Sequence, residues 1–196
     1  FIQTVLLVPW LSTLPLPALA LPDGFVYLED VAPTLLQEPR YYGTNNFVGE
    51  RIDGYLAPKI IITRPAAEAL AHVQEQLQPF GLGLKVFDAY RPQRSVDHFV
   101  RWAKDLQDSK AKSDFYPNVP KTELFRRGYI AARSSHSRGS TVDLTLVSLD
   151  NGQALDMGTP FDYFSPLSGP KNLDIPAPQR AHRLLLRQLM VRHGFI

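Results

Sequence analysis

The sequence predicts an α+β domain with a central antiparallel sheet and helices packed mainly against one of its faces. Hydrophobic residues make up 44% of the 196 residues, which is enough apolar surface for the core of one domain of ordinary size. The 17 prolines and 12 glycines are spread along the chain, as in a loop-rich domain rather than a helical bundle. Apolar residues recur at the helical period in some segments and at the strand period in others.

A helix, a strand and a second helix are predicted in succession in the first half of the chain. Thr63 and Pro65 mark the start of the first helix, whose apolar residues recur at helical spacing up to Leu77. Residues 82–89 are predicted to form a strand, and Pro92 then opens the second helix. The apolar stripe of this second helix consists of Val96, Phe99, Val100, Ala103 and Leu106.

A polar turn followed by a strand is predicted further along. Residues 134–139 are polar and turn-like, and residues 141–146 alternate between polar and apolar side chains with period two. The alternation places Val142 and Leu144 on one face of the strand and Asp143 on the other. We therefore expect Asp143 to point away from the apolar layer.

A third helix is predicted near the end of the sequence, over residues 179–193. Its buried face consists of Leu185, Leu186, Leu189 and Met190. Gly194 is the expected glycine after the C-cap, and Phe195 is the apolar residue that packs back on the last turn. Because a domain seldom ends on such a cap, we expect at least one further strand after Ile196.

Composition and charge exclude several kinds of site. The formal net charge is +2 and charged residues make up 20%, so no strong field attracts nucleic acid or anionic lipid. Without cysteine, a metal site must use histidine and carboxylate ligands. His136 precedes a glycine turn and Asp143 lies on the strand that follows, so the two could converge on one ion. The alternatives are a hydrogen-bonded pair or two unrelated polar residues.

The stretch that begins at Ser134 resembles a family signature, Ser-x-His-x-x-Gly-x-Ala-x-Asp. This is the signature of the D-alanyl-D-alanine dipeptidases related to the VanX vancomycin-resistance proteins. His136, Gly139 and Asp143 match it, and Thr141 stands in place of the alanine. Other motifs similar to the dipeptidases are residues 87–92, 116–118, 137–140, 143–146 and 157–162. The resemblance implies the zinc peptidase fold of a wider group, which includes D-Ala-D-Ala carboxypeptidases and the hedgehog signalling domain.

The resemblance implies a zinc site with an arginine beside it. His136 and Asp143 would hold one Zn²⁺ ion, which would lower the pKa of a bound water to roughly 7. Arg91 would stabilise the negative charge that develops on the carbonyl oxygen of the substrate during hydrolysis. From the residue alone, a surface salt bridge is the alternative for Arg91.

The resemblance also implies three substrate-binding residues and a small substrate, a D-amino-acid dipeptide such as D-alanyl-D-alanine. Asp162 would lie near the free ammonium group of the dipeptide, and Ser134 near its carboxylate. Tyr41 would line the pocket. The alternatives are a turn or N-cap role for Asp162 and a role in loop structure for the two hydroxyls.

One expected motif is missing from the sequence. The family takes its third zinc ligand and its general base from a Glu-x-x-His motif on a strand after the last helix, and the 196 residues contain no such motif. The remaining histidines, His72, His98, His182 and His193, are interpreted as solvated or capping residues. We therefore expect the sequence to be a piece of a longer enzyme and to be inactive on its own.

Two other functions keep the same zinc site. One is a carboxypeptidase or endopeptidase that acts on peptidoglycan stem peptides. The other is a noncatalytic zinc-binding module, as in the hedgehog domain. A Glu-x-x-His motif soon after Ile196 would favour an enzyme, and its absence would favour a binding protein.

Residues 1–20 are predicted to be a signal peptide that is clipped at its N-terminus. An apolar run covers residues 5–11, and Ala18-Leu19-Ala20 resembles a cleavage site. Prolines interrupt the stretch, so no stable membrane span is expected. The zinc dipeptidase domain, residues 21–196, would then work in the periplasm or elsewhere outside the cytoplasm. It would be cytoplasmic if the segment is instead an apolar arm packed on the domain.

Overall fold

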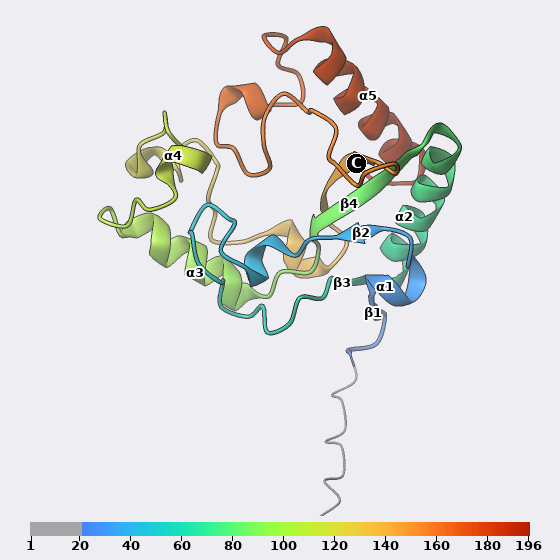
Figure 1. The fold of residues 1–196 in the computed structure, drawn as a ribbon. Coiled ribbons are helices and arrows are strands. Elements are labelled where there is room, and N and C mark those ends of the chain that lie inside the picture. Colours follow the sequence, from blue (N-terminus) through green and yellow to red (C-terminus); the bar gives the residue numbers. More distant parts are fainter. Residues whose placement is uncertain (1–20) are drawn as a thin grey trace, which may run out of the picture.

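The computed structural model describes residues 21–196, so the predicted signal peptide at residues 1–20 lies outside the described residues (Figure 1). In chain order the strands and α-helices are β1 (Phe25–Tyr27), α1 (Leu28–Val31), β2 (Leu36–Gln37), β3 (Ile61–Thr63), α2 (Arg64–Leu77), β4 (Leu82–Asp88), α3 (Gln93–Lys104), α4 (Lys112–Phe115), β5 (Asp143–Ser148) and α5 (Ala177–Arg192). The 3-10 helices are η1 (Arg40–Tyr42), η2 (Gln78–Phe80), η3 (Lys121–Glu123), η4 (Ser135–Arg138) and η5 (Pro166–Ser168). None of the helices in this part of the chain has the length and apolar character that a membrane crossing requires.

The main sheet has three strands in the order β2-β4-β5, and a separate antiparallel pair is formed by β1 and β3. The prediction of an antiparallel sheet is confirmed for β4 and β5 but is wrong for β2, which runs parallel to β4. Between β2 and β4 the chain passes through β3 and α2. This crossover returns the chain to the end of the sheet where β2 starts, so β4 runs in the same direction.

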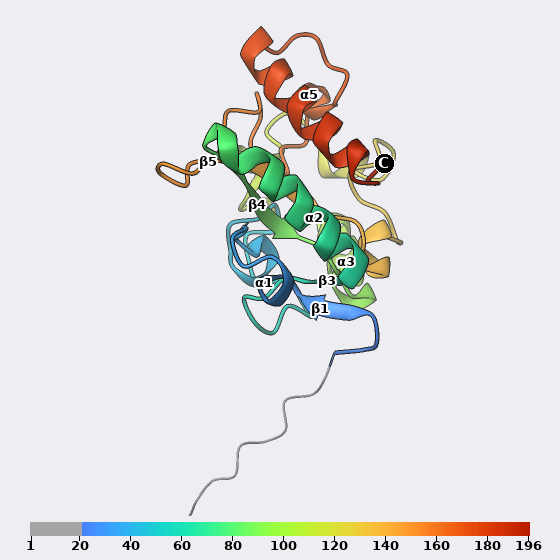
Figure 2. The ribbon, with the colours of Figure 1, turned by 90° about the vertical axis from the view of Figure 1, so that its right-hand side faces the viewer.

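Two helices, α2 and α5, pack against the same face of the sheet, and Figure 2 shows both in front of β4 and β5. Leu70, Val73 and Leu77 of α2 join Leu84, Val86 and Leu146 of the sheet in one buried cluster. Leu185, Leu186, Leu189 and Met190 of α5 are partly buried against it. The predicted glycine cap of α5 is present, because Gly194 has a φ of 89° and the Phe195 N–H donates to the Met190 carbonyl.

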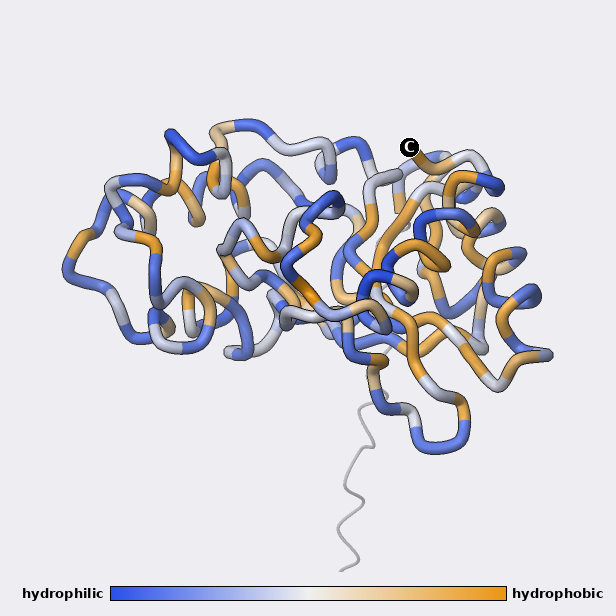
Figure 3. Tube along the Cα trace, turned by 90° about the horizontal axis from the view of Figure 1, so that it is seen from above, coloured by the Kyte–Doolittle hydropathy of each residue, from blue (hydrophilic) through white to orange (hydrophobic). Residues whose placement is uncertain are grey.

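A second hydrophobic cluster is rich in aromatic side chains and lies on the other side of the molecule, around α3 and α4 (Figures 1 and 3). Its aromatic members are Tyr41, Phe47, Tyr55, Phe99, Trp102, Phe115, Tyr116 and Phe164. The prediction that Leu106 continues the apolar stripe of α3 is wrong, since this side chain is 55% exposed. The helix ends at Lys104 and Asp105 takes an extended conformation, which turns the chain away.

An irregularity in β4 decides which side chains meet at the end of the sheet. Val86 is paired with Leu144, but the next pair along joins Asp88 to Asp143, so β4 has one extra residue at Phe87. Such a bulge moves the following residue to the opposite face of the sheet. Asp88 therefore shares a face with Asp143, away from α2 and α5.

Candidate active site

His136 is held by the short helix η4 and by one hydrogen bond from its ring. Its Nδ1 lies 2.8 Å from the carbonyl oxygen of Ala89. A carbonyl only accepts, so Nδ1 carries the proton of the neutral ring and Nε2 keeps a free lone pair. Ser134 is the N-cap of η4, and its Oγ accepts a hydrogen bond from the backbone N–H of His136 at 3.3 Å.

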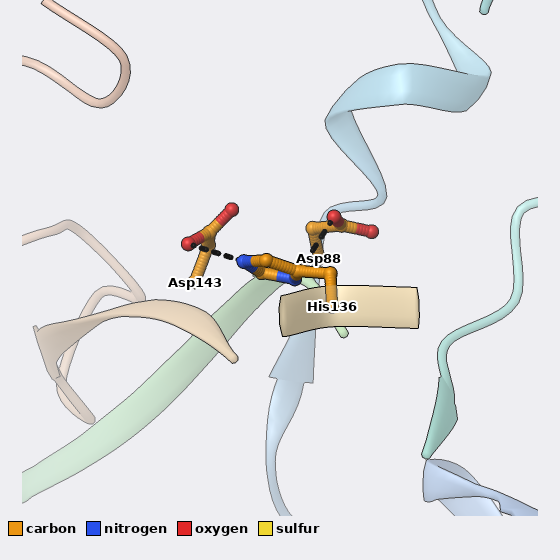
Figure 4. Close-up of side chains that lie close together, drawn as sticks. All are labelled: Asp88, His136 and Asp143. Carbon is orange, nitrogen blue, oxygen red and sulfur yellow. Dashed lines mark ion pairs between the residues drawn. The ribbon is translucent and has the colours of Figure 1, made fainter. Parts of the chain in front are cut away.

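The free Nε2 of His136 faces the carboxylate of Asp143, and their Nε2 and Oδ1 atoms lie 3.4 Å apart (Figure 4). Two ligands at about 2.0–2.1 Å from a tetrahedral zinc stand roughly 3.3 Å apart. The two residues therefore fit one zinc ion in donor type, tautomer and spacing. Burial lowers the pKa of His136, but Asp143 outweighs this effect and leaves the pKa raised.

Asp88 lies beside the same histidine but at its other edge. One ligand atom each from Asp88, His136 and Asp143 lie within 4.8 Å of one another, and Figure 4 shows the carboxylates at opposite ends of the imidazole. Asp88 Oδ2 is 3.4 Å from Nδ1, the nitrogen that donates to Ala89. An ion bound by Nε2 and Asp143 thus lies on the side of the ring away from Asp88.

Arg91 follows the end of β4 and lies between the two carboxylates. Its Nε and Nη2 donate to Asp88 Oδ2 at 3.0 and 2.8 Å, and Nη2 also reaches Asp143 Oδ2 at 3.3 Å. The guanidinium also lies over the rings of Tyr41 and Phe99. Burial lowers the pKa of Arg91, but the acidic groups around it, Tyr41, Asp88 and Asp143 among them, hold the pKa well above its ordinary value.

Asp162 and Tyr41 form a second pair across the site. The hydroxyl of Tyr41, a buried residue, donates to Asp162 Oδ2 at 2.6 Å. Asp162 has a φ of 55°, an unusual conformation for a residue other than glycine. Burial raises the pKa of Asp162 to about 7, and the charge of Asp143 adds to the shift. Arg183 of α5 fixes the loop that carries Asp162 by donating to the carbonyl oxygens of Met157, Leu167 and Gly169.

All six residues singled out from the sequence line one cavity of about 230 Å³. They are Tyr41, Arg91, Ser134, His136, Asp143 and Asp162. Aromatic side chains, Phe47, Phe99, Tyr129 and Phe164, form much of the remaining wall. A larger groove of about 1140 Å³ adjoins the cavity between β5, the Asp162 loop and α5, and shares Asp143 and Asp162 with it.

Two further residues belong to the site but are missed by the sequence analysis. Asp88 is 1% exposed and holds Arg91, and the hydroxyl of Tyr55 donates to Asp88 Oδ1 at 2.7 Å. Asp88 belongs to the motif at residues 87–92, so that motif is a signal for it. No sequence signal connects Tyr55, which is 33 residues away, to the motif.

Comparisons with known proteins identify the family of the chain. The family model described as D-ala-D-ala dipeptidase matches residues 22–196. The D-alanyl-D-alanine dipeptidase of Streptomyces coelicolor is 41% identical over 171 residues, which cover 87% of this chain and 85% of that protein. The D-alanyl-D-alanine dipeptidase of Enterococcus faecalis is 39% identical, over 88% of this chain and 86% of that protein. The D-alanyl-D-alanine dipeptidase of Escherichia coli is 30% identical, over 87% of this chain and 78% of that protein.

The family match and the relatives make the chain a metallopeptidase. Within that class, the chain belongs to the D-alanyl-D-alanine dipeptidase family.

We expect Gly139→Ala to destabilise the protein and to weaken zinc binding. Gly139 has a φ of 80°, and a Cβ there would lie 2.3 Å from the ring of Phe25. The left-handed backbone alone costs an alanine about 1–2 kcal/mol, and the clash adds to this cost by moving the turn that carries His136. Thermal unfolding and zinc titration measure both effects. Gly81→Ala is the matched control, since Gly81 has a φ of 68° and no atom within 4 Å of the added Cβ. Equal losses in the two variants would contradict the steric argument.

Proposed function

We propose that the protein hydrolyses the dipeptide D-alanyl-D-alanine with the help of one Zn²⁺ ion. The supporting observation is that Nε2 of His136 and the carboxylate of Asp143 lie 3.4 Å apart at the wall of a small cavity. Sites for drug-sized ligands usually enclose about 300–1,000 Å³, so about 230 Å³ suits a smaller molecule. The choice of substrate is supported by the relatives, which are D-alanyl-D-alanine dipeptidases.

In this proposal His136 and Asp143 hold the ion, which would supply an activated water and polarise the peptide carbonyl. Arg91 stabilises the negative charge on that carbonyl oxygen as water adds to the carbon. Its Nε and Nη2 are engaged by Asp88 and Asp143, whereas its Nη1 makes no hydrogen bond to residues 21–196. The free Nη1–H groups are therefore available as donors in the cavity.

The two ends of the dipeptide would be bound by the other three residues. Asp162 accepts hydrogen bonds from the free ammonium group, and the oxygen of Tyr41, whose hydrogen goes to Asp162, accepts another. Ser134 uses its oxygen to accept from the His136 N–H, so its hydroxyl hydrogen is left for the substrate carboxylate. A site with one group for each end favours a dipeptide over a longer chain.

The adjoining groove supports a second candidate, a carboxypeptidase or endopeptidase that acts on peptidoglycan stem peptides. The groove opens beside Asp143 and Asp162 and has about 1140 Å³ of space, which is enough for several more residues of substrate. We favour the dipeptide because Asp162 can bind an ammonium group only if the N-terminus of the substrate lies beside it.

The first experiment measures hydrolysis of D-Ala-D-Ala and of a stem pentapeptide by the complete natural protein. Here we propose that the third zinc ligand and the general base come from the Glu-x-x-His motif of the family, which the 196 residues do not contain. We expect faster hydrolysis of the dipeptide, loss of activity in a chelator, and recovery on addition of zinc. Faster release of alanine from the pentapeptide would overturn the choice of substrate. A protein that binds zinc but cleaves neither peptide would be a noncatalytic binding module.

We expect Asp162→Asn to raise KM for D-Ala-D-Ala by about 10-fold to 100-fold with a smaller change in kcat. A hydrogen bond to a charged group is worth about 1.5–3 kcal/mol, and the amide keeps the size of the side chain but loses its charge. Steady-state kinetics test this. Asp150→Asn, a change in an exposed turn, is the control. An unchanged KM would show that Asp162 does not bind the ammonium group.

We further propose that the protein is exported and recycles dipeptide released from the cell wall. The proposal is supported by the apolar run and the small-residue triplet in residues 1–20. Fractionation of cells that express the natural gene should place the activity outside the cytoplasm. Activity confined to the cytosolic fraction would refute export.

A further inference from the structure

Asp88 is a buried acid that the proposed mechanism does not use. It is 1% exposed and it lines neither the cavity nor the groove, so it does not touch a substrate bound there. An ionised carboxylate is seldom buried unless it is paired and hydrogen-bonded. Its partners therefore indicate what it does.

Both oxygens of Asp88 are engaged by residues outside the metal pair. Oδ1 accepts from the hydroxyl of Tyr55 at 2.7 Å, and Oδ2 accepts from Nε and Nη2 of Arg91 at 3.0 and 2.8 Å. Two donors of one guanidinium on a single carboxylate oxygen fix the plane of that guanidinium. Tyr55 in turn fixes the carboxylate, since its hydroxyl is directed at the other oxygen.

Arg91 has a competing partner in Asp143. Its Nη2 lies 3.3 Å from Asp143 Oδ2, against 2.8 Å from Asp88 Oδ2. If Asp88 lost its charge, the guanidinium would be drawn toward Asp143, which is the nearest remaining carboxylate. Its free Nη1 would then turn away from the cavity, whereas Oδ1 of Asp143, the oxygen that faces Nε2 of His136, would stay available to zinc.

We propose that Asp88, fixed by Tyr55, is a positioning residue that holds Arg91 toward the cavity and away from Asp143. This rests on the proposed function, because it is Arg91 that acts on the substrate. Asp88 is not a zinc ligand in this assignment, although it lies beside His136. It contacts the Nδ1 edge of that ring, whereas the lone pair that faces Asp143 is on Nε2.

The test compares Asp88→Asn with the wild-type complete protein. We expect kcat for D-Ala-D-Ala to fall by about 10²-fold to 10³-fold, the loss typical of removing one donor to the developing oxyanion. KM should change less, and zinc content and resistance to a chelator should stay at the wild-type level. Asp88→Glu should recover part of kcat. Asp53→Asn is the control, since it removes an exposed ion pair with Arg101 and should change nothing.

A double-mutant cycle tests whether Asp88 acts through Arg91. If it does, adding Asp88→Asn to Arg91→Lys should lower kcat by less than threefold, because the group that Asp88 positions is already gone. Additive losses would overturn the proposal. Loss of zinc in Asp88→Asn would also overturn it and would make Asp88 a ligand.

A readout that needs no activity separates this proposal from the proposed function. In the wild type the Nε–H proton of Arg91 should exchange slowly with solvent in NMR spectra, and Asp88→Asn should speed the exchange at least tenfold. The wild type could be inactive on the dipeptide while Asp88→Asn still speeds the exchange of the Arg91 Nε–H proton. That result would refute the proposed function but support the proposal that Asp88 positions Arg91. If exchange is unchanged in a folded variant, the positioning fails.

If Asp88→Asn does not fold, Tyr55→Phe takes its place because it leaves both charges in position. We expect it to lower kcat by about threefold to tenfold and to speed the Nε–H exchange of Arg91. Tyr116→Phe is the matched control, since Tyr116 is also buried but its hydroxyl has no hydrogen-bond partner among the described residues. Equal kcat values for the two variants would overturn the role of Tyr55.

Discussion

The site is shaped by an excess of negative charge that is wholly or partly buried. Three carboxylates, Asp88, Asp143 and Asp162, surround one guanidinium, so the fully ionised groups carry a net charge of −2. Burial raises the pKa of Asp88 to about 6 and that of Asp162 to about 7, which shows how strongly these surroundings oppose a further negative charge. A divalent cation between His136 and Asp143 would balance the excess. The same excess would attract the ammonium group of a substrate.

The fold creates this concentration of charge with two local departures from regular structure. The bulge at Phe87 moves Asp88 onto the face of Asp143, and the left-handed turn at Gly139 brings His136 back over the same end of the sheet. The opposite face of β4 and β5 packs against α2 and α5. Because that packing fixes the positions of the strands, the charged groups are held close together despite their repulsion.

Regular features of the site follow from the sequence, and irregular ones do not. Period-two alternation predicts that Asp143 points away from Leu144, and the glycine after α5 predicts its cap. The same alternation, continued through β4, would place Asp88 in the apolar layer with Val86. The bulge places Asp88 on the opposite face instead. A single extra residue in a strand leaves no periodic signal in the sequence that could reveal the bulge. The strand β2 has only two residues, which is too short to show an alternation of polar and apolar side chains. Neither this strand nor its parallel direction can therefore be predicted from the sequence.

The aromatic side chains that line the cavity both limit the size of the substrate and stabilise the fold. Phe47, Phe99 and Phe164 line the cavity and also belong to the second hydrophobic cluster, where Phe47 lies within 5.1 Å of the other two ring centroids. Truncating a buried phenylalanine to alanine costs about 3–5 kcal/mol, a large part of the stability of a domain. Enlarging the cavity from this side would therefore weaken the cluster that supports Tyr41 and α3. Within residues 21–196, room for a longer substrate lies instead on the side of the Asp162 loop, where the groove adjoins the cavity and Arg183 sets the position of the chain.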